Sequence, residues 1–204
     1  MTSYTDPTQH FFWLASRALG IVAIALLAVS VTLGLLFSGR YSRSPGVPAW
    51  LKHLHEAVAL TALGAIAGHG LLLLGDSYLR PGITGIVLPF AIAVKPIWTG
   101  LGVIGGWLAA LLGLSFYVRR FIGLRTWRWL HRWTVAVYGL AVAHAFGSGT
   151  DAASPWFVVL LAVVTTPPLF LLILKFLPRP SRSRMAGTHG RTAPALAPPA
   201  RVSR

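Results

Sequence analysis

The stretch HEAVALTALGAIAGH, residues 55–69, is the most informative part of the sequence, because two histidines enclose an apolar segment whose only charged residue is Glu56. The stretch HRWTVAVYGLAVAH, residues 131–144, repeats this arrangement. A histidine inside an apolar helix is costly and therefore marks a functional site. Separations of 14 and 13 residues place the histidines of each stretch about 20 Å apart along a helix. Each stretch therefore carries histidines at two different depths.

The composition is that of an integral membrane protein. Of the 204 residues, 55% are hydrophobic and 11% are charged, which is far too apolar for a soluble domain. Runs of about 20 apolar residues match a hydrocarbon core of roughly 30 Å. We therefore predict an all-α bundle of five transmembrane helices, over residues 11–37, 55–75, 98–118, 131–148 and 156–177.

Three segments lie outside these predicted spans. Residues 1–10 form a short amino-terminal tail. Residues 76–97 are apolar but are broken by prolines and glycines, so we expect a loop that dips into the membrane interface. Residues 178–204 are mostly proline, small residues and arginine. Because such a composition forms no hydrophobic core, we expect a disordered basic tail.

The distribution of charge predicts the orientation. Eighteen Lys and Arg residues against four acidic residues give a net charge of +14. In a soluble protein this excess would indicate nucleic-acid binding, but here the basic residues gather after the first, third and fifth spans, and we expect no nucleic acid as a partner. Positive residues remain cytoplasmic, so we predict a multi-pass protein of the plasma (inner) membrane with its amino terminus outside and its carboxyl terminus inside.

This orientation puts His55 and His131 near the cytoplasmic face, and His69 and His144 near the outer face. A b-type haem needs one neutral imidazole on each side of its iron. The predicted ligand pairs are therefore His55 with His131 for an inner haem and His69 with His144 for an outer haem. The chain has no cysteine, which excludes thioether attachment and an iron–sulfur cluster. We expect two non-covalent haem b groups.

Helical periodicity raises a difficulty for one stretch. At 100° per residue, a separation of 14 leaves about 40°, so His55 and His69 share a face. A separation of 13 leaves about 140°, which requires local tightening or a kink, and we predict it at residues 138–142, beside Gly139. His53 is a second candidate for the inner ligand. It ranks below His55 because its separation from His69 leaves about 160°.

Glycines near the outer histidines have two interpretations. Gly68 and Gly70 flank His69, and they either give a flat macrocycle room or let helices pack closely. For Gly102 and Gly106 we favour helix packing.

The chain resembles the ferric reductase-like transmembrane domains, a family that includes the membrane parts of NADPH oxidases and ferric-chelate reductases and the haem subunit of a bacterial methionine sulfoxide reductase. The resemblance extends from about residue 11 to 156, and its specific part is the histidine spacing of 14 and 13. It lies in LASRALGIVAIALLAVSVTLGLLFSGR, LHEAVALTALGAIAGHGLLLLGD, LPFAIAVKPIWTGLGV and WRWLHRWTVAVYGLAVAHAFGSGTD.

This resemblance implies two stacked haems that carry single electrons from the inner to the outer side. It also implies that Arg17, in Ser-Arg-Ala, binds the propionates of the outer haem or an acceptor, with snorkelling to the headgroups as the alternative. No glycine-rich nucleotide motif follows a strand, so we expect neither flavin nor nicotinamide on this chain. The donor is then a separate flavoprotein or a quinol, and the acceptor is a ferric chelate, dioxygen or a periplasmic partner protein.

We therefore predict the membrane electron-transfer component of an oxidoreductase, embedded in the lipid bilayer. Two alternatives stay open. One is a haem subunit dedicated to a periplasmic reductase. The other is a haem-free membrane scaffold or transporter whose histidines bind a proton or a divalent metal, which predicts histidines in one plane with carboxylates nearby.

Overall fold

The computed structural model describes residues 10–38 and 48–177, and the regular elements in these ranges are all helices. The predicted tail over residues 178–204, and all but the last residue of the tail over residues 1–10, lie outside the described part. Four helices are long and apolar enough to cross a membrane, and they bear out the predicted all-α membrane architecture. These are α1 (Phe11–Phe37), α2 (Ala49–Leu72) with its 3₁₀ extension η2 (Leu73–Gly75), α4 (Pro96–Ile122) and α7 (Pro155–Phe176).

The bounds of these four helices follow from simple sequence features. α1 has the predicted bounds, and α7 differs from its prediction by one residue at each end. α4 is longer than predicted, because Pro96 occupies its first turn and Gly123, with a φ of 83°, follows its last residue. α2 begins at Ala49, directly after Pro48, instead of at His55.

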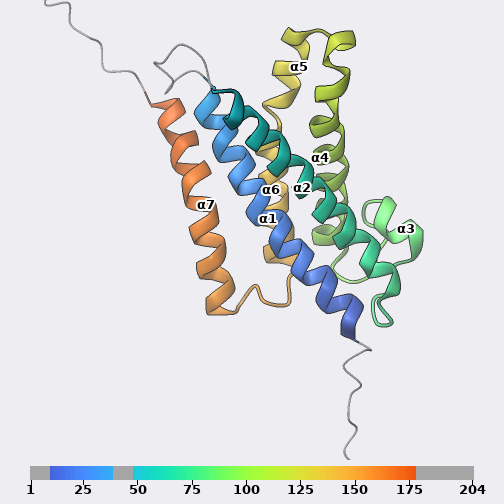
Figure 1. Cartoon of the computed structure of the whole chain (residues 1–204). Coiled ribbons are helices and arrows are strands. Elements are labelled where there is room, and N and C mark those ends of the chain that lie inside the picture. Colours follow the sequence, from blue (N-terminus) through green and yellow to red (C-terminus); the bar gives the residue numbers. More distant parts are fainter. Residues whose placement is uncertain (1–9, 39–47, 178–204) are drawn as a thin grey trace, which may run out of the picture.

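The fourth predicted span, residues 131–148, begins three residues too early, because His131 still belongs to the preceding helix. The chain forms α5 (Leu124–His131), turns at Arg132 and Trp133, and continues as α6 (Thr134–Ser148). α6 has 15 residues, and at 1.5 Å per residue it is about 22 Å long, less than the roughly 30 Å of a hydrocarbon core. Four of the five predicted spans are therefore long enough to cross a membrane, and α6 is a shorter helix that returns the chain from the α5 end of the bundle to the start of α7 (Figure 1).

A tightened backbone separates α5 from α6. The Trp133 N–H donates to the Leu130 carbonyl at 2.9 Å, and the Arg132 N–H donates to the Trp129 carbonyl at 3.3 Å. These three-residue steps are typical of a 3₁₀ turn. The irregularity predicted at residues 138–142 is wrong, because α6 is continuous there. The break lies at Arg132 and Trp133, before the predicted residues, because arginine and tryptophan are favoured at a membrane interface over the hydrocarbon core.

The helices pack so that the two histidine stretches face each other. α2 packs against α1 and α4, and α6 packs against the same two helices, while α7 covers α1 (Figure 1). α2 and α6 are therefore diagonally opposite in a four-helix arrangement. In Figure 1, α5 lies at one end of the bundle with the last turns of α4, and the short helix α3 (Gly82–Val87) lies near the opposite end of α4.

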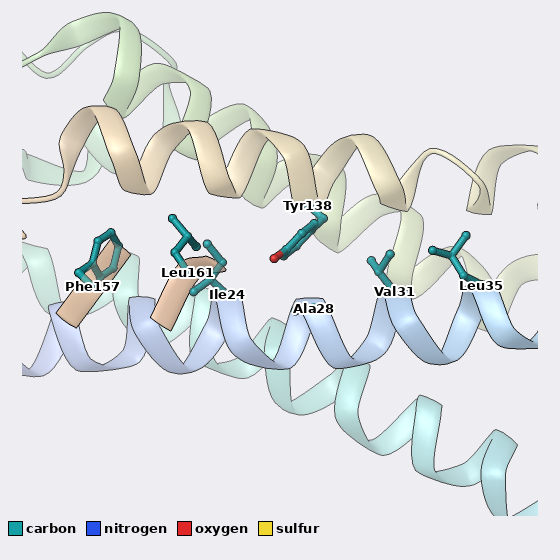
Figure 2. Packing of buried hydrophobic residues seen from close by; sticks show 7 residues of the cluster. All are labelled: Ile24, Ala28, Val31, Leu35, Tyr138, Phe157 and Leu161. Atoms are coloured by element: carbon teal, nitrogen blue, oxygen red, sulfur yellow. The ribbon is translucent and has the colours of Figure 1, made fainter. Parts of the chain in front are cut away.

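Two apolar clusters hold the bundle together. The larger one joins α1, α6 and α7, and Figure 2 shows Tyr138 reaching from α6 toward α1. The Tyr138 hydroxyl also hydrogen-bonds the Thr165 hydroxyl of α7 at 2.8 Å. The smaller cluster joins α4 and α6 to α2, through Ala109, Leu112 and Val137 with the adjoining side chains Leu63, Ile66, Leu108 and Leu130.

The outward faces of the helices are apolar too. Large side chains on them are widely exposed, such as Leu111 at 65%, Val163 at 63% and Phe170 at 58%. Exposed apolar surface along whole helices is what a protein presents to lipid tails. The fold therefore supports a membrane-embedded chain.

Candidate functional site

The structure brings together the two pairs of histidines expected from the sequence. The ring centroids of His55 and His131 are 6.1 Å apart, with an angle of 85° between the ring planes. The ring centroids of His69 and His144 are also 6.1 Å apart, with an angle of 73°. His55 and His69 both belong to α2, so the two levels are separated by about 21 Å along that helix. We call them the 55/131 pair and the 69/144 pair.

The break between α5 and α6 allows His131 and His144 to face the same helix, α2. His131 is the last residue of α5, whereas His144 lies in α6. The two residues therefore do not belong to one ideal helix, in which a separation of 13 would point them to different sides. The tightened turn at Arg132 and Trp133 lets both rings face α2.

Hydrogen bonds fix one side of each ring in the 69/144 pair. The Nδ1 atom of His69 lies 2.8 Å from the Ser16 carbonyl oxygen and 3.0 Å from the Ser16 hydroxyl. That hydroxyl donates to the His69 carbonyl at 2.8 Å. The Nδ1 atom of His144 lies 2.9 Å from the Trp98 carbonyl oxygen. Because a carbonyl only accepts, Nδ1 carries the proton in both rings and Nε2 keeps its free lone pair.

The 55/131 pair is held by weaker polar contacts and by aromatic rings. The Nδ1 atom of His55 lies 3.5 Å from the Ser30 hydroxyl. The Nδ1 atom of His131 is buried and makes no well-formed hydrogen bond within the described residues, although the Leu112 carbonyl is close enough to interact with it. The Trp127 ring stacks on His131 at 5.1 Å. Hydrogen bonding therefore orients the 69/144 pair more firmly than the 55/131 pair.

Glycines on neighbouring helices make room for three of the imidazoles. A Cβ atom at Gly102 would lie 2.5 Å from Nδ1 of His144, so this position tolerates no side chain without movement. The interpretation of Gly102 as a helix-packing residue therefore needs correction, because its nearest neighbour is a candidate ligand. Gly106 keeps that interpretation, since a Cβ there would meet Ile66 at an ordinary 3.6 Å.

The glycines next to His69 in the sequence have other surroundings. A Cβ at Gly68 would lie 2.6 Å from Leu19, so this glycine lets α1 approach α2. A Cβ at Gly70 would meet nothing within 4 Å. The residue that touches the His69 ring is Gly20 of α1, where a Cβ would lie 3.1 Å from Nδ1.

The alternative inner ligand, His53, is exposed, whereas His55 is half-buried and faces His131. The structure therefore places His55, and not His53, at the site.

Arg17 has a carboxylate partner that sequence reasoning missed. Its guanidinium forms an ion pair with Asp151, in the segment between α6 and α7. The same group lies 5.2 Å from the ring centroid of Trp13 and 5.9 Å from that of Trp156. An arginine near apolar helices needs such a partner. Because Arg17 follows Ser16 directly, this ion pair lies at the end of the bundle that holds the 69/144 pair.

The donor set at each level fits a haem iron. Among residues 10–38 and 48–177, no three His, Cys, Asp or Glu side chains come close enough to hold a metal ion by themselves. Two imidazoles on one axis are what a haem requires, because the porphyrin supplies the remaining ligands. With metal–nitrogen bonds of about 2 Å, two coaxial imidazoles have centroids about 6.3 Å apart. The distance of 6.1 Å between the ring centroids at both levels is compatible with this value.

Comparisons of the chain with protein-family models, with curated proteins and with solved structures found no match. The resemblance to ferric reductase-like transmembrane domains therefore rests on the residues and spacings quoted from the sequence.

Proposed function

We propose that this chain is a di-haem b cytochrome that transfers electrons across the membrane. The observation that carries the proposal is the presence of two facing histidine pairs, with equal centroid distances of 6.1 Å, at two levels of one apolar bundle. His55 and His131 would hold one haem, and His69 and His144 the other. When bound, haem supplies one-electron redox chemistry.

The side chains of this chain would bind, orient and shield the cofactors. The proton on Nδ1 of His69 and His144 is held by backbone carbonyls, which leaves Nε2 as the metal-binding atom. Such outer hydrogen bonds orient a ligand and raise its basicity. Between the two levels lies the smaller apolar cluster of α4, α6 and α2, which excludes water from the path. The bundle thus sets both the ligation and the separation of the two centres.

In this proposal, electrons enter from a cytoplasmic flavoprotein or quinol and leave to a ferric chelate, dioxygen or a partner protein at the 69/144 end. The orientation follows from the distribution of Lys and Arg. The chain binds the two haems and shields them from water, and a partner oxidoreductase supplies or accepts the electrons. A haem subunit dedicated to a periplasmic reductase differs only in its acceptor.

The haem-free scaffold or transporter is supported less well. It predicts histidines in one plane with carboxylates nearby, whereas the four half-buried histidines occupy two levels. The carboxylate closest in sequence, Glu56, accepts a hydrogen bond from the Tyr117 hydroxyl at 2.9 Å. The observed arrangement favours haem ligation over a proton or metal pathway.

The decisive experiment is a pyridine haemochrome assay on detergent-purified protein, together with a reduced-minus-oxidised spectrum. We expect two haem b per chain in the wild type and about one in His69→Ala. The matched control is His53→Ala, which removes an exposed histidine of the same helix and should leave two haems. Well-folded wild-type protein without haem would contradict the proposal and bring the scaffold or transporter forward.

A further inference from the structure

α1 carries a short motif twice, and each copy lies against one histidine of α2. The motif is a serine followed four residues later by a glycine, as Ser16 with Gly20 and Ser30 with Gly34. The copies are 14 residues apart, which is also the separation of His55 and His69. Because α1 and α2 pack antiparallel, the first copy meets His69 and the second meets His55.

The contacts of the two copies correspond. Ser16 places its hydroxyl 3.0 Å and its carbonyl oxygen 2.8 Å from Nδ1 of His69. Ser30 places its hydroxyl 3.5 Å from Nδ1 of His55. The backbone of Ser30 is also close enough to interact with the His55 ring. Both serines are buried, with exposed fractions of 1% and 8%.

The glycine of each copy lies one turn further along α1. A Cβ at Gly20 would be 3.1 Å from Nδ1 of His69, and a Cβ at Gly34 would be 3.6 Å from Cε1 of His55. The serine therefore binds the Nδ1 edge of the ring, and the glycine lets the ring lie close to the backbone of α1.

Ser16 differs in its hydrogen bonding from two threonines of the same two helices. Thr32 of α1 donates to the Ala28 carbonyl of its own helix at 2.7 Å, and Thr61 of α2 donates to the Ala57 carbonyl at 2.9 Å. This is the usual bond of a hydroxyl residue in an apolar helix. Ser16 instead donates across to the carbonyl of His69. The Ser16 hydroxyl therefore bonds α2, which carries His69, and not its own helix.

We propose that Ser16 and Ser30 are the positioning residues of the two α2 histidines, one for each haem. The inference rests on the proposed function. Each serine fixes the Nδ1 edge of its histidine, so that Nε2 lies on the side of the ring away from α1. A hydrogen bond from Nδ1–H also makes the imidazole a more basic ligand, which favours ferric over ferrous iron. Removing the hydroxyl takes away one of the two acceptors beside Nδ1 of His69 while the Ser16 carbonyl stays, and it should therefore raise the reduction potential of one haem and leave the other unchanged.

The test compares Ser16→Ala, Ser30→Ala and the control Thr32→Ala in detergent-purified protein. Redox titration of the haem spectrum gives the potential of each haem, and electron paramagnetic resonance of the ferric protein reports the orientation of its imidazoles. We expect Ser16→Ala to change the reduced-to-oxidised ratio of the 69/144 haem threefold to tenfold at a fixed potential, where tenfold is about 59 mV for one electron. Ser30→Ala should act on the 55/131 haem alone, and more weakly, because its hydroxyl contact is longer.

Two further arms keep the outcome clear. Ser16→Thr retains a hydroxyl and should move the potential back toward the wild type. In protein prepared without haem, nitrogen NMR should find the proton of the His69 ring on Nδ1, and the Nδ1 resonance should shift in Ser16→Ala, which keeps the carbonyl acceptor and loses the hydroxyl 3.0 Å away. Each serine variant is also combined with His69→Ala, which removes the 69/144 haem. A shift that persists in the combined variant then belongs to the 55/131 haem.

Separate results overturn the inference and the proposed function. If wild-type protein binds two haems but both serine variants match Thr32→Ala in potential and resonance, the positioning role is wrong and the haem protein stands. Equal shifts of both haems in each variant would also overturn it, because they would show a general structural effect. Wild-type protein without haem would overturn the proposed function and this inference together.

Discussion

Arg17 of α1 and Asp151, in the segment between α6 and α7, form an ion pair that joins α1 to this connection at the end of the bundle that holds the 69/144 pair. The two side chains are 30% and 17% exposed, so the pair is neither fully solvated nor fully buried. Trp13 and Trp156 lie beside the guanidinium from α1 and α7. The pair therefore fixes how the α6–α7 connection lies against α1.

Asp151→Asn should destabilise the protein by about 1–3 kcal/mol, between the values for exposed and for buried ion pairs. The loss arises because the charge of Arg17 keeps its desolvation and loses its partner. Thermal unfolding in detergent measures the change. The double variant Arg17→Gln/Asp151→Asn should lose less than the sum of the two single variants, and strict additivity would show that the ion pair contributes nothing.

If Arg17 meets the propionates of the 69/144 haem, as the family resemblance implies, Arg17→Gln should lower the reduction potential of that haem alone, because it removes a positive charge that favours the reduced form. Redox titration of this variant measures the effect. Asp151→Asn is the matched control, because it removes the same ion pair and keeps the arginine. An identical shift in both variants would assign the effect to the ion pair and not to a bond between Arg17 and the haem.

Gly102→Ala should remove the haem of the 69/144 pair. The added Cβ would lie 2.5 Å from Nδ1 of His144, which is too close, so the ring must leave its bond to the Trp98 carbonyl. We expect haem content to fall from two to about one per chain in the haemochrome assay. Gly106→Ala, one turn away on the same helix, meets only Ile66 at 3.6 Å and should keep two haems. Equal haem content in both variants would contradict this role of Gly102.

Pairs of histidine substitutions test which residues share a haem. The double variant His55→Ala/His131→Ala should lose only one haem, because both ligands belong to the same level. His55→Ala/His69→Ala should lose both haems, because it removes one ligand from each level. Haem content and the spectrum of the remaining haem distinguish these outcomes. Loss of both haems in the first double variant would show that the two levels are not independent.

A control for folding is available from the loop between α2 and α4. The Trp107 indole N–H donates to the Val87 carbonyl at 2.9 Å and so ties α3 to α4. Trp107→Phe should lower the unfolding temperature through loss of this bond, with a cost of about 0.5–1.5 kcal/mol. Its haem content should stay at two, which separates general destabilisation from a change at the histidines.

Much of this architecture follows from the sequence by itself. Long apolar runs predict membrane helices because a backbone in lipid must satisfy its own hydrogen bonds, and the bounds of α1 and α7 agree with that reasoning within one residue. The histidine spacing predicts two levels, because the rise per residue of a helix is constant. These properties depend only on residues that are neighbours along the chain.

Other features depend on the packing of the helices and on local backbone geometry. The tertiary structure placed the helix break at Arg132 and Trp133, gave Gly102 to His144, and paired Arg17 with Asp151. It also set Ser16 and Ser30 against the histidines of α2, although their 14-residue repeat was readable in the sequence. The contacts of Gly102, Arg17 and the two serines join residues that lie far apart along the chain. Their partners depend on how the helices pack in space, which no local sequence pattern specifies.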